Sequence, residues 1–251
     1  MSKKPTKAQV RAQAVGDRQR ASDAAAKQRR NRTVLWGGLA LVVVIAIVVA
    51  VVASGGSDDS ASATKWETAP VKVTGTPLPE FDKETSPDPA IGETVPTLTG
   101  KSVYDGTAVT IGPDSGDGKP QMIVFVAHWC PHCQAEVPRL VQLADDGVFD
   151  GVAVSAVATA TSDQATNYPP SAWLKRDKWP FPVMADSPTG TGAQAYGLTS
   201  YPYFVLVNAD GTVAGRGSGE LPEDQIKANI EALKAGKDLP ITSSDESSSA
   251  S

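Results

Sequence analysis

The sequence has 251 residues, of which 41% are hydrophobic and 20% charged, with a formal net charge of −5 at pH 7, two cysteines and two histidines. This length allows one globular domain with additional segments. Two cysteines exclude a disulfide-stapled scaffold and a four-cysteine zinc site. The 22 glycines and 19 prolines follow no period, which excludes a collagen or a coiled coil.

Positive charge is concentrated at the N-terminus, in residues 1–33. This segment has ten lysines and arginines against Asp17 and Asp23, a net charge of +8, so that the rest of the chain carries −13. A basic arm binds nucleic acid in some proteins, but this one lacks aromatic residues to stack on bases and runs directly into an apolar segment. We therefore expect no nucleic-acid partner.

An uninterrupted apolar run follows at residues 34–53. It contains no charge and no side-chain amide, and as a helix it would span about 30 Å, the thickness of a bilayer's hydrocarbon core. A cleaved signal peptide is the alternative, but its basic start and apolar core are shorter. Because the neighbouring lysines and arginines precede the run, we expect a single-pass cell-membrane protein whose residues 1–33 are cytoplasmic and whose remaining chain is extracytoplasmic, where disulfides persist.

The exported part divides into four segments. Residues 54–65 are rich in Ser, Gly and Asp and are predicted to form a flexible tether. Residues 66–90 begin with a short alternating strand that prolines then interrupt, so we expect an extended lead-in. Residues 91–240 are predicted to fold as one domain, and the serine-rich residues 241–251 to be a disordered tail.

Strand and helix patterns alternate within the folded domain. Strands are predicted at residues 121–127, 152–158, 182–185 and 203–207, with a hairpin turn into 212–214, and helices at 131–145, 171–178, 191–196 and 222–234. Ser171 is the expected N-cap of the second helix, and Pro222 is expected in the first turn of the last. The alternation implies parallel pairing and the hairpin implies an antiparallel edge, which together predict a mixed α/β sheet flanked by helices.

The candidate site is a Cys-x-x-Cys pair at a strand-to-helix junction. Cys130 stands at the start of the predicted helix, where unpaired backbone N–H groups and the helix dipole favour a thiolate. Cys133 follows one turn later and could attack a mixed disulfide formed at Cys130. Pro131 occupies the first helical position, where the missing N–H breaks no hydrogen bond. This context predicts a redox dithiol rather than a metal knuckle.

Three further features make the segment resemble the thioredoxin superfamily. Trp129 directly precedes the first cysteine, and Pro138 lies eight residues after it, where the family kinks its active-site helix. The run Tyr-Gly-Leu-Thr-Ser-Tyr-Pro at residues 196–202 matches the one that ends in the family's cis-proline. The resemblance covers about residues 90–237 and implies a thioredoxin-like fold, with thiol:disulfide exchange as the activity.

The resemblance also implies roles for individual residues. Those implied to be catalytic are Cys130, Pro131, His132 and Cys133, and those implied to contact substrate are Trp129, Tyr201 and Pro202. No cofactor is expected besides the Cys130–Cys133 disulfide. An extra strand and helix at residues 152–178 and the segment at 91–96 resemble the TlpA/ResA branch of membrane-tethered redoxins. The family's buried Asp is replaced by Val124, so Cys133 must be deprotonated by water, by the substrate or by another group.

The direction of exchange is open between two expectations. The Pro131-His132 dipeptide resembles that of the DsbA oxidases, in which a stabilised thiolate makes the disulfide more oxidising. Relatives of the TlpA/ResA type include reductants for cytochrome c maturation. We favour oxidation of exported cysteine-containing polypeptides, with a quinone-linked membrane oxidase as partner, and keep reduction, with a transmembrane electron donor, as the alternative.

Two other functions would use the same residues. A copper or other metal module would use His128, Cys130, His132 and Cys133, but four ligands within six residues can hardly surround one ion. We therefore predict no metal site. His128 is ambiguous and is expected to be a solvent-facing neighbour that tunes charge. Peroxide reduction is disfavoured because the residues before Cys130 lack the Thr-x-x-Cys arrangement.

Overall fold

A computed structural model describes residues 66–239. The predicted cytoplasmic segment 1–33, membrane span 34–53, tether 54–65 and tail 241–251 lie outside the described residues. Within residues 66–239, the helices are too short or too polar to cross a bilayer.

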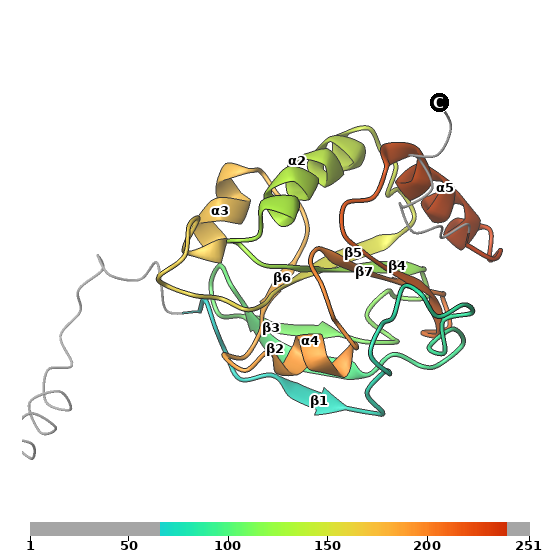
Figure 1. Cartoon of the computed structure of the whole chain (residues 1–251), viewed down its shortest axis with the longest axis horizontal. Coiled ribbons are helices and arrows are strands. Elements are labelled where there is room, and N and C mark those ends of the chain that lie inside the picture. Colours follow the sequence, from blue (N-terminus) through green and yellow to red (C-terminus); the bar gives the residue numbers. More distant parts are fainter. Residues whose placement is uncertain (1–65, 240–251) are drawn as a thin grey trace, which may run out of the picture. The chain divides into compact units, whose positions relative to one another are not determined.

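The described residues form eight strands and four helices around one sheet (Figure 1). The strands are β1 (Lys72–Thr74), β2 (Thr97–Ser102), β3 (Ala108–Ile111), β4 (Gln121–Val126), β5 (Ala153–Ala158), β6 (Val183–Ala185), β7 (Tyr203–Val207) and β8 (Val213–Ser218). The helices are α2 (Pro131–Asp145), α3 (Pro170–Arg176), α4 (Thr191–Ala195) and α5 (Glu223–Lys234).

The sheet is mixed, with a parallel centre and antiparallel flanks. Its strand order is β1-β2-β6-β5-β4-β7-β8, and β3 pairs with β2 outside this path. Strands β4, β5 and β6 run parallel, whereas β7 and β8 close one side antiparallel and β2 closes the other. Every residue of β4 is buried because both faces of the central strand are covered, which explains its continuous apolar sequence.

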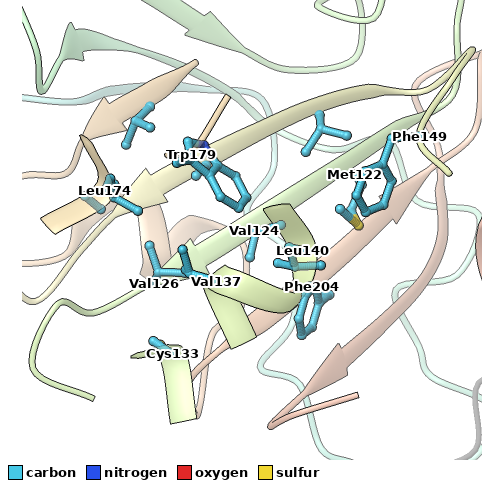
Figure 2. Packing of buried hydrophobic residues seen from close by; sticks show 14 of the residues in the cluster. Met122, Val124, Val126, Cys133, Val137, Leu140, Phe149, Leu174, Trp179 and Phe204 are labelled. Atoms are coloured by element: carbon cyan, nitrogen blue, oxygen red, sulfur yellow. The ribbon is translucent and has the colours of Figure 1, made fainter. Parts of the chain in front are cut away.

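Two hydrophobic clusters cover the two faces of the sheet. Helices α2, α3 and α5 lie on one face and α4 on the other (Figure 1). The first cluster includes Leu140, Trp173 and Ile230 from these three helices, and the second contains Tyr196 and Tyr203 with residues of the lead-in. Cys133 belongs to the first cluster, so the second cysteine of the candidate site is part of the main core (Figure 2).

The structure departs from the predicted elements at several places. Strands β2 and β3 were not predicted, because their sequences alternate only weakly and contain Gly100 and several threonines. Strand β8 extends to Ser218, beyond the predicted hairpin end. The N-cap of α3 is Pro169 rather than Ser171, since the Ser171 hydroxyl and backbone N–H both bind the buried carboxylate of Glu67.

Helix α5 begins at Glu223, with Pro222 as its N-cap instead of a member of its first turn. Pro222 has an extended ψ of 141°, which is the ordinary N-cap conformation. The difference is one residue and leaves the predicted helix in place.

The lead-in is held on the domain by one buried arginine. Arg216 of β8 has a fully buried side chain, and its Nε donates to Asp88 at 2.8 Å. Its Nη1 donates to the carbonyl of Pro79 at 2.7 Å and to the Tyr203 hydroxyl at 3.2 Å. The guanidinium carbon lies 5.3 Å from the ring centroid of Phe81. Arg216 thus contacts the lead-in at three residues, Pro79, Phe81 and Asp88.

The same lead-in packs against the turn that precedes Pro202. The Phe81 N–H donates to the Gly197 carbonyl at 2.8 Å, and the Thr199 hydroxyl donates to the Phe81 carbonyl at 2.9 Å. Gly197 has φ of +72°, and a Cβ there would lie 2.1 Å from the Pro79 carbonyl oxygen. Only glycine therefore fits this approach, and the lead-in supports one wall of the candidate site.

Candidate active site

The junction of β4 and α2 positions the dithiol. Cys130 is the N-cap of α2, with φ of −76° and ψ of 121°, and Pro131 occupies the first turn as predicted. Cys130 makes no side-chain hydrogen bond that caps the helix, and the first backbone N–H groups of a helix have no acceptor within the helix itself. The N-terminus of a helix carries a partial positive charge, which interacts favourably with a negative charge placed there.

The predicted cis-proline loop lies against the first cysteine. The Tyr201–Pro202 peptide bond is cis, and the Cys130 Sγ lies 4.0 Å from the Tyr201 carbonyl oxygen. Residue Cys130 is only 6% exposed, so this loop limits the directions from which another sulfur can approach. The structure thus brings together Cys130, Tyr201 and Pro202, although 71 residues separate Cys130 from Tyr201.

Cys133 has a different environment from Cys130. It is completely buried, and its Sγ accepts a hydrogen bond from the Ala127 N–H at 3.5 Å. Burial raises the pKa of the Cys133 thiol far above its ordinary value, and the neighbouring Cys130 and Glu136 add to this rise. Figure 2 shows Cys133 among apolar side chains between α2 and the sheet. The two sulfurs are therefore chemically unequal, with Cys133 held as a neutral thiol.

A buried carboxyl lies one helical turn beyond Cys133. Glu136 has a fully buried side chain, and its Oε2 forms an ion pair with Arg139 Nη2 at 3.1 Å. Burial raises the pKa of Glu136 to about 7, although Arg139 opposes this rise. Sequence reasoning missed Glu136 and recognised only that Val124 replaces the expected acid. The available signal was a glutamate on the buried stripe of α2, three residues after Cys133.

His132 extends to the surface, where it meets a second glutamate. Its side chain is 67% exposed, and Nδ1 lies 2.7 Å from Oε1 of Glu220, in the segment between β8 and α5. The other oxygen of Glu220 is 3.1 Å from Arg139 Nη1. The prediction included His132 but not Glu220, because 88 residues separate the two in sequence and no motif marks the contact.

Two aromatic residues border the dithiol. Trp129 is 38% exposed, and its indole N–H donates to the Ala160 carbonyl at 2.7 Å. Its ring meets that of Tyr201 edge to face, with centroids 5.9 Å apart. The structure thus places both predicted substrate-contacting aromatics side by side and next to Cys130. A partly exposed apolar pair of this kind is suited to contact a polypeptide.

A groove continues from the cis-proline loop. It has a volume of about 410 Å³ and is lined by Glu80, Phe81, Asp82, Lys83, Glu84, Thr199, Ser200 and Ser218. Two of these residues, Thr199 and Ser200, belong to the loop that ends at Pro202.

His128 is buried, which corrects the expectation of a solvent-facing neighbour. The residue is 1% exposed. Its Nδ1 lies 2.7 Å from the Thr166 carbonyl, and its Nε2 accepts from the Ser162 N–H at 3.1 Å. This pair of contacts requires the neutral ring with the proton on Nδ1. His128 therefore fixes the loop between β5 and α3 instead of tuning the charge of the dithiol.

We expect His128→Ala to loosen this loop. The substitution leaves the Ser162 N–H and the Thr166 carbonyl without their hydrogen-bond partner. An unsatisfied buried group of this kind costs about 1–3 kcal/mol of stability. Hydrogen-exchange mass spectrometry should show faster exchange in residues 160–168. His132→Ala is the matched control, because its ring is exposed, and it should leave exchange in that loop unchanged. Equal protection in both variants would contradict the assigned role.

Comparison with known proteins identifies the family. A sequence model described as Redoxin matches residues 90–233. Thiol:disulfide interchange protein TxlA of Synechococcus elongatus is 29% identical over 126 residues, which cover 49% of this chain and 51% of TxlA. Thiol:disulfide interchange protein HelX of Rhodobacter capsulatus is 29% identical over 123 residues, covering 49% of this chain and 65% of HelX.

Further similarities agree with the TlpA/ResA resemblance and with the fold. Thiol-disulfide oxidoreductase ResA of Halalkalibacterium halodurans is 25% identical over 118 residues, covering 47% of this chain and 64% of ResA. The matches thus span between about half and two thirds of these relatives. A crystal structure of an uncharacterized conserved protein from Geobacillus kaustophilus aligns with a TM-score of 0.53 at 23% identity, over 69% of this chain and 91% of that one. With its thioredoxin-like α/β fold and a family match over more than half of its length, this chain belongs to the Redoxin family, among TlpA/ResA-like relatives named for thiol:disulfide exchange.

Proposed function

We propose that this chain is a membrane-anchored, extracytoplasmic thiol:disulfide oxidoreductase whose Cys130–Cys133 pair exchanges disulfides with exported polypeptides. The inequality of the two sulfurs carries this proposal. Cys130 lies at a helix start beside the cis-proline loop, whereas Cys133 is a buried thiol with a raised pKa. One sulfur thus meets substrate and leaves readily, and the other resolves the intermediate.

The oxidative reaction uses only these two sulfurs and the substrate. A substrate thiolate attacks the Cys130 sulfur, the Cys130–Cys133 bond breaks, and Cys133 leaves with the electron pair and takes up a proton. A second substrate thiolate then attacks the substrate sulfur of the mixed disulfide and releases the Cys130 thiolate. The substrate gains a disulfide, and the enzyme receives two electrons, which a membrane oxidase must remove. Reduction runs through the same steps in reverse.

The proposed location rests on the sequence. The apolar run at residues 34–53 and the basic residues before it support a single-pass anchor that leaves the domain outside the cytoplasm. An oxidising compartment is where a disulfide-exchanging domain finds cysteine-containing substrates. The partner for reoxidation would be a quinone-linked membrane protein, and a reductase would instead need a transmembrane electron donor.

Contacts of the two histidines support thiol chemistry over a metal module. Both ring nitrogens of His128 bind backbone groups of one loop. One ring nitrogen of His132 is taken by Glu220. A metal bound between these histidines and the two cysteines would have to displace the first set of contacts from the buried core.

The decisive experiment is a substrate trap. Cys133→Ala removes the resolving sulfur but leaves Cys130, so mixed disulfides with exported proteins should accumulate and disappear on treatment with dithiothreitol. Cys130→Ala and the double variant are the controls and should trap nothing. Absence of mixed disulfides from the Cys133→Ala protein, or stoichiometric copper or zinc in the purified wild type, would contradict the proposal.

A redox titration tests the favoured direction. Equilibration of the domain with glutathione buffers should give a potential of about −120 to −200 mV, as expected for an oxidant. The His132→Ala variant should give a lower value, because it loses the group that favours the reduced form. A wild-type potential below about −250 mV would reverse the preference and support a reductase.

A further inference from the structure

Glu220 lies at the rim of the dithiol, held there from the side of the cis-proline loop. The N–H of Gly219 donates to the Pro202 carbonyl at 2.8 Å, so the backbone next to Glu220 is tied to the loop that faces Cys130. The side chain of Glu220 is 35% exposed. Its position is therefore set by the β8–α5 segment and not by the helix that carries the cysteines.

The carboxylate of Glu220 bridges two side chains of α2. Its Oε1 accepts from the Nδ1–H of His132 at 2.7 Å, and its Oε2 accepts from Arg139 at 3.1 Å. Arg139 also donates to the Leu221 carbonyl and forms an ion pair with Glu136 at 3.1 Å. Four charged or ionisable side chains thus contact one another in sequence, from the exposed His132 to the buried Glu136: His132, Glu220, Arg139 and Glu136.

This arrangement gives the His132 ring a carboxylate, that of Glu220, as its hydrogen-bond partner. In a Cys-Pro-His-Cys motif the histidine makes the disulfide more oxidising by favouring the Cys130 thiolate. Here the imidazole donates to a carboxylate, which places a negative charge in the same surroundings. Because a negative charge disfavours a nearby thiolate, Glu220 and His132 act on Cys130 in opposite directions.

The sign of the effect follows from the combined charge of Glu220 and His132, with the protonation of His132 the same in the variant and the wild type. Replacing Glu220 with glutamine then removes one negative charge and makes the combined charge of the two side chains more positive. If the imidazole releases a proton in response, the combined charge stays the same. Arg139 keeps its charge throughout. Where the combined charge becomes more positive, removal of Glu220's charge favours the thiolate at Cys130.

We propose that Glu220 is a positioning residue that holds the His132 ring and makes the Cys130–Cys133 disulfide less oxidising than the same motif without it. This inference rests on the proposed function, since it concerns the equilibrium of that dithiol. Reduction by glutathione converts two glutathione thiols into one glutathione disulfide. The protein takes the two electrons and becomes a Cys130 thiolate and a Cys133 thiol, and one proton passes to solvent.

The test compares Glu220→Gln with the wild type in glutathione buffers at pH 7. The equilibrium constant for reduction of the protein should rise about threefold to tenfold, as expected for one charge acting across a half-exposed site. The midpoint pH for alkylation of Cys130 by iodoacetamide should fall in parallel. His132→Ala should shift both quantities in the opposite direction, which a merely structural role for Glu220 would not produce.

Glu223→Gln is the matched control, because Glu223 is 59% exposed and pairs with Lys227 along α5. It should leave the equilibrium constant and the alkylation midpoint unchanged. If the wild type exchanges normally but the equilibrium constant for reduction of Glu220→Gln is equal to or lower than that of the wild type, the inference about Glu220 is overturned and the proposed function is not. A wild type that fails to exchange with glutathione would instead overturn the proposed function.

Discussion

Glu136→Gln is expected to stabilise the folded domain at alkaline pH. Burial raises the pKa of Glu136 to about 7, above its ordinary value of 4.5. A group with a raised pKa in the folded state contributes its full stability below about pH 4.5, and this stability is lost as the pH rises toward 7. The loss is at most about 3 kcal/mol. Because glutamine does not ionise, the variant should equal the wild type near pH 4 and exceed it by up to that amount at pH 8.

Urea denaturation at pH 4, 6 and 8 measures this difference directly. Glu223→Gln makes the same chemical change at an exposed site and should show no comparable pH dependence. A difference between Glu136→Gln and the wild type that stays constant from pH 4 to pH 8 would show that the carboxyl titrates in the folded protein as it does in the unfolded chain, so that its pKa is not raised.

The same substitution should slow the resolution of mixed disulfides. Cys133 is a buried neutral thiol and must lose a proton before it attacks the sulfur at Cys130. Glu136 supplies a carboxyl one turn away on the same buried face of α2. Loss of a positioned proton acceptor lowers a rate by about a hundredfold or more. Glu136→Gln is therefore expected to be more stable at alkaline pH but slower in resolving mixed disulfides. This combination is expected of a buried charge that serves function.

Stopped-flow fluorescence of Trp129, which lies beside Cys130, follows this step. In the wild type the rate should increase through about pH 7, where Glu136 ionises, and in Glu136→Gln this increase should be absent. An unchanged rate and pH profile would assign proton removal to water or to the substrate.

The dithiol and its loop could be predicted from sequence because each depends on local signals. A fully buried strand followed by Cys130 and Pro131 identifies a strand-to-helix junction. The family resemblance predicted the cis-proline at Pro202. In the structure this loop lies beside the dithiol because β7, which begins directly after Pro202, runs antiparallel to β4, so that the start of β7 meets the end of β4. In the structure β4 and α2 lie within one residue of their predicted bounds.

The charged residues around the dithiol could not be predicted in this way. Glu220 reaches His132 from 88 residues away, and a contact between a loop and a helix start has no periodicity. His128 and His132 are the same residue type and flank the same cysteine. His128 is buried because it faces the β5–α3 loop, whereas His132 is exposed. Tertiary packing, and not local sequence, decides such roles.

The support of the cis-proline loop likewise depends on a distant residue. The lead-in contacts the turn at residues 195–199 through the backbone of Leu78 and Phe81. It remains there because Arg216 of β8 binds Asp88 and the Pro79 carbonyl. The buried charge of Arg216, in the edge strand β8, therefore helps to hold the lead-in against the loop that faces Cys130.

Arg216→Met is consequently expected to have the largest effect on stability. Breaking a buried ion pair by removing one partner costs about 3–5 kcal/mol, because the remaining charge is left uncompensated. Burial alone would raise the pKa of Asp88, but hydrogen bonds from Arg216 and the Ala90 N–H hold it below its ordinary value. The pair therefore stabilises the fold above about pH 4 and loses this contribution as the pH falls through the pKa of Asp88.

Urea denaturation at pH 7 measures the loss, with Arg176→Met as the control. The Arg176 side chain is 58% exposed and pairs with Asp177 at 2.9 Å, so its removal should cost less than about 1 kcal/mol. The double variant Arg216→Met, Asp88→Leu should recover part of the loss, because no unpaired charge remains. Similar stability of Arg216→Met and Arg176→Met would mean that apolar contacts and backbone hydrogen bonds are enough to hold the lead-in, and that the wall beside Cys130 does not depend on Arg216.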